Sequence, residues 1–241
     1  MVIYYVPTTT STNHLAKAFK ASPPPFGIMS GHQKQGEGTF GQRWWDAPRC
    51  ALLTTVVVAP QYLNVQAHWK WNMAICLTVA EVLENYSQVE VQIKWPNDLF
   101  IKGKKVGGLL VQNTISKGHI RRCYIGIGIN FNNTSFPSTL PNACTILQAT
   151  GRKISPTGMM PTLCQSLHSL SENIAFRSLP DTRRNYLDRF YQLHQVQDFR
   201  HLLSGNELSA KVMGVTAEGL LQLKTVDGVR AFRMKEVEWI F

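Results

Sequence analysis

The sequence lacks the features of a membrane protein and of a secreted, disulfide-bonded protein. It has five cysteines in 241 residues, an odd number, and none of them forms a Cys-x-x-Cys pair. Neither a disulfide framework nor a zinc site is therefore predicted. The longest apolar run, at 51–59, is far shorter than the ~20 residues of a membrane helix, and the N-terminus has no signal-peptide core. We expect a soluble, cytoplasmic protein with reduced thiols.

Acidic side chains are also scarce. The chain has 15 Asp and Glu against 25 Lys and Arg, which gives a formal net charge of +10. A positive balance of this size favours anionic partners such as nucleotides, nucleic acid or acidic proteins, although a basic surface without a partner has the same composition. The 44% hydrophobic content can bury a core, and the length suits one main domain with a small appendage.

The elements of the first ninety residues follow from their apolar spacing. Ser11 is placed to cap a helix through NHLAKAFKA, which the SPPP cluster at 22–25 would end. Apolar residues three and four positions apart predict a second, well-buried helix at 64–86. Alternation and β-branched residues predict strands, and these cover 3–8, 26–33 and 51–58.

The pattern becomes β-rich from 90 to 132, where KGKK and SKGH are plausible hairpin turns, so an antiparallel sheet is predicted. Helices follow at 158–177 and 181–193, and the chain ends in four short strands typical of a small SH3-like β-barrel. The predicted fold class is α+β, with a mixed, largely antiparallel sheet and flanking helices. The predicted domains are 1–194 and 195–241.

The segment GEGTFG at 36–41 has the G-x-G-x-x-G spacing of a dinucleotide-binding fingerprint. That fingerprint needs a strand before it and a helix N-terminus directly after it, so that backbone amides can hold a pyrophosphate. The residues that follow, QRWWDAP at 42–48, contain two tryptophans and a proline and do not begin a convincing helix. The dinucleotide interpretation is therefore rejected, and a mobile surface loop remains as the simplest alternative.

Two further segments carry unusual chemistry. Lys94 ends an apolar strand and is followed by WPND at 95–98, so a cation and several polar groups meet at a strand end. Such a lysine suits a phosphate or a carboxylate, although a surface lysine before an ordinary turn has the same sequence. In IGIGINFNN at 125–133, alternating glycines leave room for another backbone or a flat ligand, or mark a bend in the strand.

Taken together and in this order, the motifs closely resemble the biotin protein ligases, in their short form without an N-terminal DNA-binding domain. The resemblance covers nearly the whole chain. It rests on STN at 11–13, the Q-x-x-G-x-G loop from Gln33 to Gly38 with Trp44 after it, KWPND at 94–98, GGLLVQ at 107–112 and GIGINFNN at 126–133. It implies a class II aminoacyl-tRNA synthetase-like catalytic fold with a C-terminal SH3-like domain.

The resemblance implies a two-step reaction. The carboxylate of biotin attacks the α-phosphate of ATP, which gives biotinyl-5'-adenylate and pyrophosphate. The amine of a lysine on a biotin carboxyl carrier domain then attacks the adenylate and releases AMP. Mg²⁺ would enter with ATP and not at a dedicated protein site. The resemblance also implies no specific DNA binding and is consistent with a homodimer.

Specific residues are assigned through the resemblance. Lys94 is the candidate catalytic cation, because two anions that react with each other need a fixed positive charge. The biotin site would contain Ser11, Thr12, Asn13, Gln33, Gly36 and Lys94. The adenylate loop would contain Glu37, Gly38, Thr39, Phe40, Gly41, Arg43 and Trp44, with Trp44 covering the adenine. The neighbourhood of the nucleotide and Mg²⁺ would contain Asn97, Asp98, Gly107, Gly108 and Asn130.

The loop departs from the family pattern, which is approximately G-R-G-R-x-G-x-x-W. Glu37 and Thr39 stand where arginines are usual. A charge reversal about 6 Å from a phosphate is worth on the order of 1–3 kcal/mol, so weaker retention of the adenylate is expected unless Lys34 or Arg43 compensates. Two alternatives remain open: a ligase for lipoate or octanoate, and a binding protein of this fold without catalysis.

Overall fold

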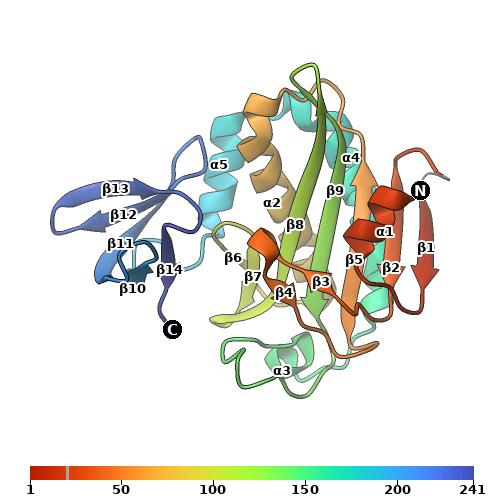
Figure 1. Ribbon diagram of the computed structural model, residues 1–241, viewed down its shortest axis with the longest axis horizontal. Helices are drawn as coiled ribbons and strands as arrows, with labels where there is room; N and C mark the ends of the chain where they lie inside the picture. Colours follow the sequence, from red (N-terminus) through yellow and green to blue (C-terminus); the bar gives the residue numbers. More distant parts are fainter. Residues whose placement is uncertain (20–21) are drawn as a thin grey trace.

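A seven-stranded sheet forms the centre of the molecule in the computed structural model, which describes residues 1–19 and 22–241 (Figure 1). The strand order is β1-β2-β5-β9-β8-β7-β6, and only β1 and β2 pair in parallel within it. The strands are β1 (Val2–Val6), β2 (Phe26–Ser30), β5 (Ala51–Val58), β6 (Gln92–Lys94), β7 (Asp98–Ile101), β8 (Lys104–Ser116) and β9 (His119–Asn130). The predicted mixed, largely antiparallel sheet is confirmed.

Helices cover both faces of this sheet. The helices α2 (His68–Ser87), α4 (Met160–Asn173) and α5 (Leu179–Asp188) lie together on one face, and α1 (Thr12–Ala18) lies on the other (Figure 1). Every residue of β5 is buried because α1 packs on one side of it and α4 on the other. That double cover explains why β5 is a continuous apolar and β-branched run and does not alternate with polar residues.

The hairpin turns of the β-rich segment are those that the sequence predicts. Lys102 and Gly103 join β7 to β8, and Lys117 and Gly118 join β8 to β9, all with positive φ. Two consecutive positive φ values define the turn type that matches the twist of paired strands, and glycine adopts the second at no steric cost. These turns fix the register of β7, β8 and β9, the strands that carry most of the polar motifs.

The helix boundaries differ modestly from those predicted. Ser11 caps α1 as expected, because its hydroxyl accepts from the His14 amide, and α1 ends at Ala18. The end of the predicted helix at residues 20 and 21 lies outside the described residues. A short helix that the sequence pattern did not reveal, α3 (Ile146–Thr150), begins with a capping box between Thr145 and Gln148. At five residues it is too short to show an apolar period.

The last 46 residues form a second, five-stranded antiparallel sheet at one end of the molecule (Figure 1). Its strands are β10 (Val196–His201), β11 (Glu207–Val215), β12 (Leu221–Thr225), β13 (Gly228–Phe232) and β14 (Val237–Trp239), in the order β13-β12-β11-β10-β14. The sequence predicted four strands and missed β10. No ladder joins the outer strands β13 and β14 in the described part of the chain, so the sheet is barrel-like without closing.

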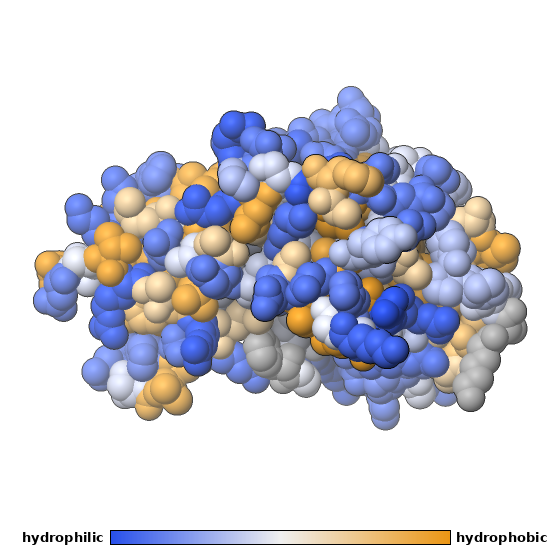
Figure 2. Space-filling view, turned by 90° about the horizontal axis from the view of Figure 1, so that it is seen from above, coloured by the Kyte–Doolittle hydropathy of each residue, from blue (hydrophilic) through white to orange (hydrophobic). Residues whose placement is uncertain are grey.

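The two sheets are joined through buried contacts. The Trp95 indole donates to the carbonyl of Gly219 at 2.9 Å, and Arg183 Nε donates to the carbonyl of Val215 at 2.7 Å. Buried residues on both sides belong to one continuous apolar cluster. On the outer surface, hydrophobic residues are scattered among hydrophilic ones (Figure 2). The boundary between 194 and 195 stays a prediction.

None of the helices in the described residues is both long and apolar enough to cross a membrane.

The cysteines differ sharply in accessibility. Cys76, Cys123 and Cys164 are buried, and burial raises the pKa of each thiol to about 12. Because the thiolate is the reactive form, these three thiols should resist modification in the folded protein. Cys50 is partly exposed, so we expect one fast-reacting thiol per chain in a titration with an aromatic disulfide at pH 7.5. Cys50→Ser should remove that fast phase; a fast phase that persists would contradict this assignment.

Candidate active site

One pocket gathers most of the motif residues. It lies on the face of the central sheet that α1 covers, between the N-terminus of α1 and the hairpin of β3 (Gly36–Glu37) and β4 (Arg43–Trp44). Its empty volume, which includes the open solvent at its mouth, is about 600 Å³. Twelve residues singled out from the sequence line it: Ser11, Thr12, Asn13, Gln33, Glu37, Gly38, Thr39, Arg43, Trp44, Asn97, Asp98 and Gly108. Segments far apart in the chain therefore meet at one place.

A fixed polar network forms the wall of the pocket at α1. The side-chain oxygen Oε1 of Gln33 accepts from the Thr12 amide at 2.7 Å and from the Thr12 hydroxyl at 3.0 Å. Thr55, which is fully buried on β5, donates to Asn13 Oδ1 at 2.5 Å. Since its oxygen is held by Thr12, the Gln33 amide nitrogen turns towards Gly36. This wall thus presents amide and hydroxyl groups whose orientations are set before any ligand binds.

Two glycines of β9 leave room for side chains from other parts of the chain. A Cβ atom added at Gly126 would lie 2.5 Å from Asn13 Oδ1, and one added at Gly128 would lie 2.6 Å from the Trp44 ring. The isoleucines that alternate with these glycines, Ile125, Ile127 and Ile129, belong to the apolar core. The space that the sequence predicted for a backbone or a flat ligand is taken here by two side chains, those of Asn13 and Trp44. The Trp44 indole lies on this glycine shelf as a flat wall of the pocket.

The glycine-rich loop is a hairpin and not a strand-to-helix turn. After β3, a single 3₁₀ turn at Thr39–Gly41 leads into β4, and the Gly38 amide donates to the Gln42 carbonyl at 2.6 Å. This geometry confirms that GEGTFG is not a dinucleotide fingerprint. The side chain of Phe40 lies outside the described residues, and Gly41 has a positive φ of 75° that favours glycine.

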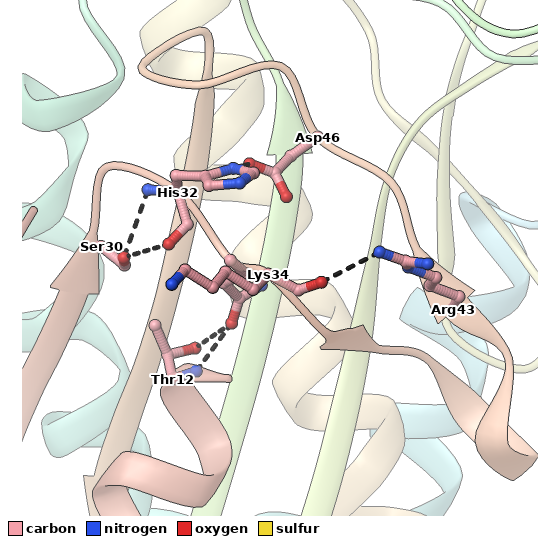
Figure 3. A network of polar contacts seen from close by, with 7 residues as sticks. Thr12, Ser30, His32, Lys34, Arg43 and Asp46 are labelled. Carbon is pink, nitrogen blue, oxygen red and sulfur yellow. Dashed lines mark hydrogen bonds and ion pairs between the residues drawn. The ribbon is translucent and has the colours of Figure 1, made fainter. Parts of the chain in front are cut away.

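The base of the hairpin is fixed by polar contacts (Figure 3). His32 Nδ1 lies 2.9 Å from Asp46 Oδ2, and the Asp46 carboxylate is almost fully buried. The Ser30 hydroxyl donates to the His32 carbonyl at 2.8 Å. Arg43 donates to the Lys34 carbonyl at 2.9 Å, so this guanidinium supports the hairpin from its exposed side. Polar contacts therefore hold the chain segments on both sides of the hairpin.

Lys105 brings an ammonium group to the pocket. Its ammonium lies 2.7 Å from Asp98 Oδ1, and both side chains are partly exposed to the pocket. The ladder between β7 and β8 has a bulge here: Leu99 pairs with Gly107, but Phe100 pairs with Lys105. Val106 is the extra residue and is buried in the core. The bulge reverses the alternation of β8, and this reversal brings Lys105 to the pocket face.

Lys94, the cation predicted from the sequence, does not line the pocket. Lys94 is half-buried, and its ammonium lies 4.3 Å from the centre of the Trp239 ring and 5.6 Å from that of Phe241. Burial lowers the pKa of Lys94, while the nearby Asp98 carboxylate opposes this shift. Lys94 pairs with Asp98 in the ladder between β6 and β7, so it lies beside the pocket, and its assignment as the catalytic cation stays a prediction.

Three of the remaining predicted residues, Gly36, Gly107 and Asn130, do not line the pocket. The Asn130 amide donates to the Cys144 carbonyl at 3.3 Å and is buried. Gly36 packs closely on Trp44, and Gly107 on the backbone of Gly128. The Asn97 amide, which does line the pocket, donates to the Leu109 carbonyl. No cluster of three or more His, Cys, Asp or Glu that could hold a metal occurs among the described residues.

Sequence reasoning missed several lining residues, which are Gln42, Thr54, Lys105, Leu109, Leu110, Gly126, Ile127 and Gly128. The glycines lie within a motif that was singled out, so the motif did indicate them. Thr55, on β5, supports the polar wall through its hydrogen bond to Asn13. This role could be predicted only if the packing of α1 on β5 and the pairing of β5 with β9 were known. For Lys105, the adjacent pair Lys104 and Lys105 before GG was the available signal.

The pocket combines a polar wall, a glycine shelf and a partly exposed ion pair, and comparisons with known proteins identify its family. The model of the biotin/lipoate A/B protein ligase family matches residues 5–130. The chain therefore belongs to the biotin/lipoate A/B protein ligase family.

Individual relatives are similar over most of the chain. The bifunctional ligase/repressor BirA of Bacillus subtilis is 24% identical over 98% of this chain and 73% of its own length. A biotin–[acetyl-CoA-carboxylase] ligase of Paracoccus denitrificans is 32% identical over 51% of each chain. Among solved structures, the biotin protein ligase of Aquifex aeolicus in complex with biotin and ATP superposes with a TM-score of 0.80, at 20% identity, covering 99% of this chain and 98% of that one.

Proposed function

We propose that this protein is a biotin protein ligase, which activates biotin with ATP to biotinyl-5'-adenylate and transfers the biotinyl group to a lysine of a carrier domain. The observation that carries the proposal is one pocket with a polar wall at α1 and an ammonium group at β8. Relatives named as biotin–[acetyl-CoA-carboxylase] ligases and structures solved with biotin and ATP support the same activity. The reaction would take place in the cytoplasm.

The polar wall suits the ureido ring of biotin. That ring is neutral and carries both a carbonyl acceptor and N–H donors, so it needs a few oriented partners in an otherwise apolar slot. Thr12, Asn13 and Gln33 offer such groups, held in place by Thr55. An unbranched acyl chain such as that of octanoate has no use for fixed amides and hydroxyls. The wall therefore favours biotin over the acids of the other family branches.

The position of Lys105 suits the chemistry of the first step. Thr55 on β5 and Asp98 on β7 are separated by two intervening strands, so the polar wall and the Lys105–Asp98 pair are about 14 Å apart along the sheet. An acid whose ring binds at the wall would extend its carboxylate towards Lys105. There the ammonium offsets the repulsion between carboxylate and α-phosphate and the charge that develops on the transferring phosphoryl group.

Mg²⁺ would enter with ATP. Its preferred ligands are oxygen atoms, and Asp98, which contacts Lys105, and its neighbour Asn97 both line the pocket. Asp98 is already ion-paired with Lys105, so it fits as one ligand at most, and the phosphates and water would supply the rest. Bound Mg²⁺ neutralises phosphate charge; the residues of the chain orient the reacting groups. Trp44 on its glycine shelf provides a flat surface for the adenine.

A panel of acids tests this function. Exchange of labelled pyrophosphate into ATP should depend on biotin, with lipoate and octanoate at least about 100-fold slower, because buried polar groups left without partners penalise the wrong acid. The second step is followed by mass spectrometry of an isolated biotin carboxyl carrier domain, with a Lys→Arg variant of its acceptor lysine as the control. Exchange with lipoate or octanoate alone would support the other family branch, and no exchange with any acid would favour a binding protein.

A further inference from the structure

Glu37, the residue with the wrong charge for an adenylate-binding loop, makes a polar contact with His14 on α1. His14 Nε2 lies 3.0 Å from Glu37 Oε1. His14 follows Asn13 on the first turn of α1, and Glu37 lies on β3 in the pocket lining. The side chains are 54% and 35% exposed, so this is a contact at the mouth of the pocket and not a core interaction.

Two other cations that line the pocket, Arg43 and Lys105, are engaged elsewhere. Arg43 stands directly opposite Glu37 in the β3–β4 ladder, but its guanidinium donates to the Lys34 carbonyl. Lys105, on the far side of the pocket, is paired with Asp98. The Glu37 carboxylate therefore has its contact on α1, with His14, and not with either of these two cations.

The base of the same loop is held independently of Glu37. His32 and the buried Asp46 join the two segments that lead into the hairpin, as Figure 3 shows. With the base fixed in this way, loss of the contact between His14 and Glu37 changes the direction of one side chain without releasing the loop as a whole. The effect of the pair is therefore separable from the folding of the loop.

We propose that His14 is a positioning residue for the ligation reaction: it holds the Glu37 carboxylate on the α1 side of the pocket mouth, away from the phosphate of the adenylate. This inference rests on the proposed function. It explains how the loop can carry a negative charge where related loops carry arginine and still retain an anionic intermediate. Without His14, the Glu37 carboxylate is free to turn towards the phosphate and repel it.

The test measures how fast biotinyl-5'-adenylate leaves the preloaded protein, in a filter-binding chase with labelled adenylate. His14→Ala should accelerate release about threefold to tenfold, as expected for a like charge brought near a phosphate at partial exposure. Glu37→Gln should release no faster than the unmodified protein. In the Glu37→Gln background, His14→Ala should change the rate by less than about twofold, because the charge to be held is gone. His14→Gln, which can still donate to Glu37, should restore slow release in part.

Lys17→Ala is the matched control, because Lys17 is an exposed residue one turn along α1 that does not line the pocket, and release should be unchanged. An equal effect of His14→Ala with and without Glu37 would show that His14 acts through α1 and would overturn the proposal. Unchanged release in His14→Ala would also overturn it. If the unmodified protein formed no adenylate from biotin and ATP, the proposed function would fail instead.

Discussion

Lys105→Ala should lower the rate of biotin-dependent pyrophosphate exchange about 100- to 1,000-fold, the usual loss when one fixed group that stabilises transition-state charge is removed. The reason is geometric. Lys105 presents an ammonium to the pocket at 2.7 Å from Asp98, and without it the pocket wall keeps the Asp98 carboxylate beside two anionic substrates. Exchange kinetics at saturating ATP and biotin measure this loss in kcat.

Lys94→Met provides the matched control for Lys105. Lys94 belongs to the same sheet, but its ammonium lies against Trp239 and Phe241, and the residue is not among those that line the pocket. Methionine preserves the apolar stem and its contacts with the aromatic rings. If Lys105 alone supplies the positive charge, exchange stays within about threefold of normal, because the main loss is the contact between an ammonium and aromatic rings. A large loss in Lys94→Met together with near-normal exchange in Lys105→Ala would assign the catalytic role to Lys94.

Gly126→Val should raise the KM for biotin at least about 100-fold, since a side chain would displace the Asn13 amide and leave buried polar groups unpaired. A Cβ atom at this position would lie 2.5 Å from Asn13 Oδ1. The Asn13 side chain cannot move freely, because it is hydrogen-bonded to the side chains of Thr55 and Gln112. Biotin titration by calorimetry gives the same comparison without turnover.

Gly126→Ala should lie between the unmodified protein and Gly126→Val, because the smaller side chain demands a smaller shift of Asn13. Thermal unfolding of both variants separates a local effect from a loss of the fold. Biotin affinity that stays normal in folded Gly126→Val would contradict the placement of the biotin ring at the α1 wall.

Much of the fold could be predicted from the sequence because its signals are local. The positive-φ turns at Lys102–Gly103 and Lys117–Gly118 have the sequence that such turns require, and the order of β7, β8 and β9 follows from them. The parallel pairing of β1 with β2 has no local signal. It depends on α1 crossing the sheet face and returning the chain in the same direction.

The sequence motifs predicted which segments form the site, but they did not single out Lys105. Lys94 and Lys105 both stand beside glycine- or proline-containing turns, and regular alternation would place Lys105 on the face opposite Gly108. The bulge at Val106 reverses that alternation, and nothing in the residues between 98 and 108 states where the extra residue falls. The aromatic residues that bury Lys94 come from β14 and the C-terminus, more than 140 positions away in the sequence.

The most direct test of the account is to look for the intermediate itself. The protein is mixed with biotin and Mg-ATP in the presence of pyrophosphatase, denatured, and examined by mass spectrometry for biotinyl-5'-adenylate. We predict close to one adenylate per chain, a strongly reduced amount in Lys105→Ala, and loss of the signal on addition of a carrier domain as its lysine becomes biotinylated. Absence of the adenylate from the folded, unmodified protein at saturating substrates would contradict the central claim.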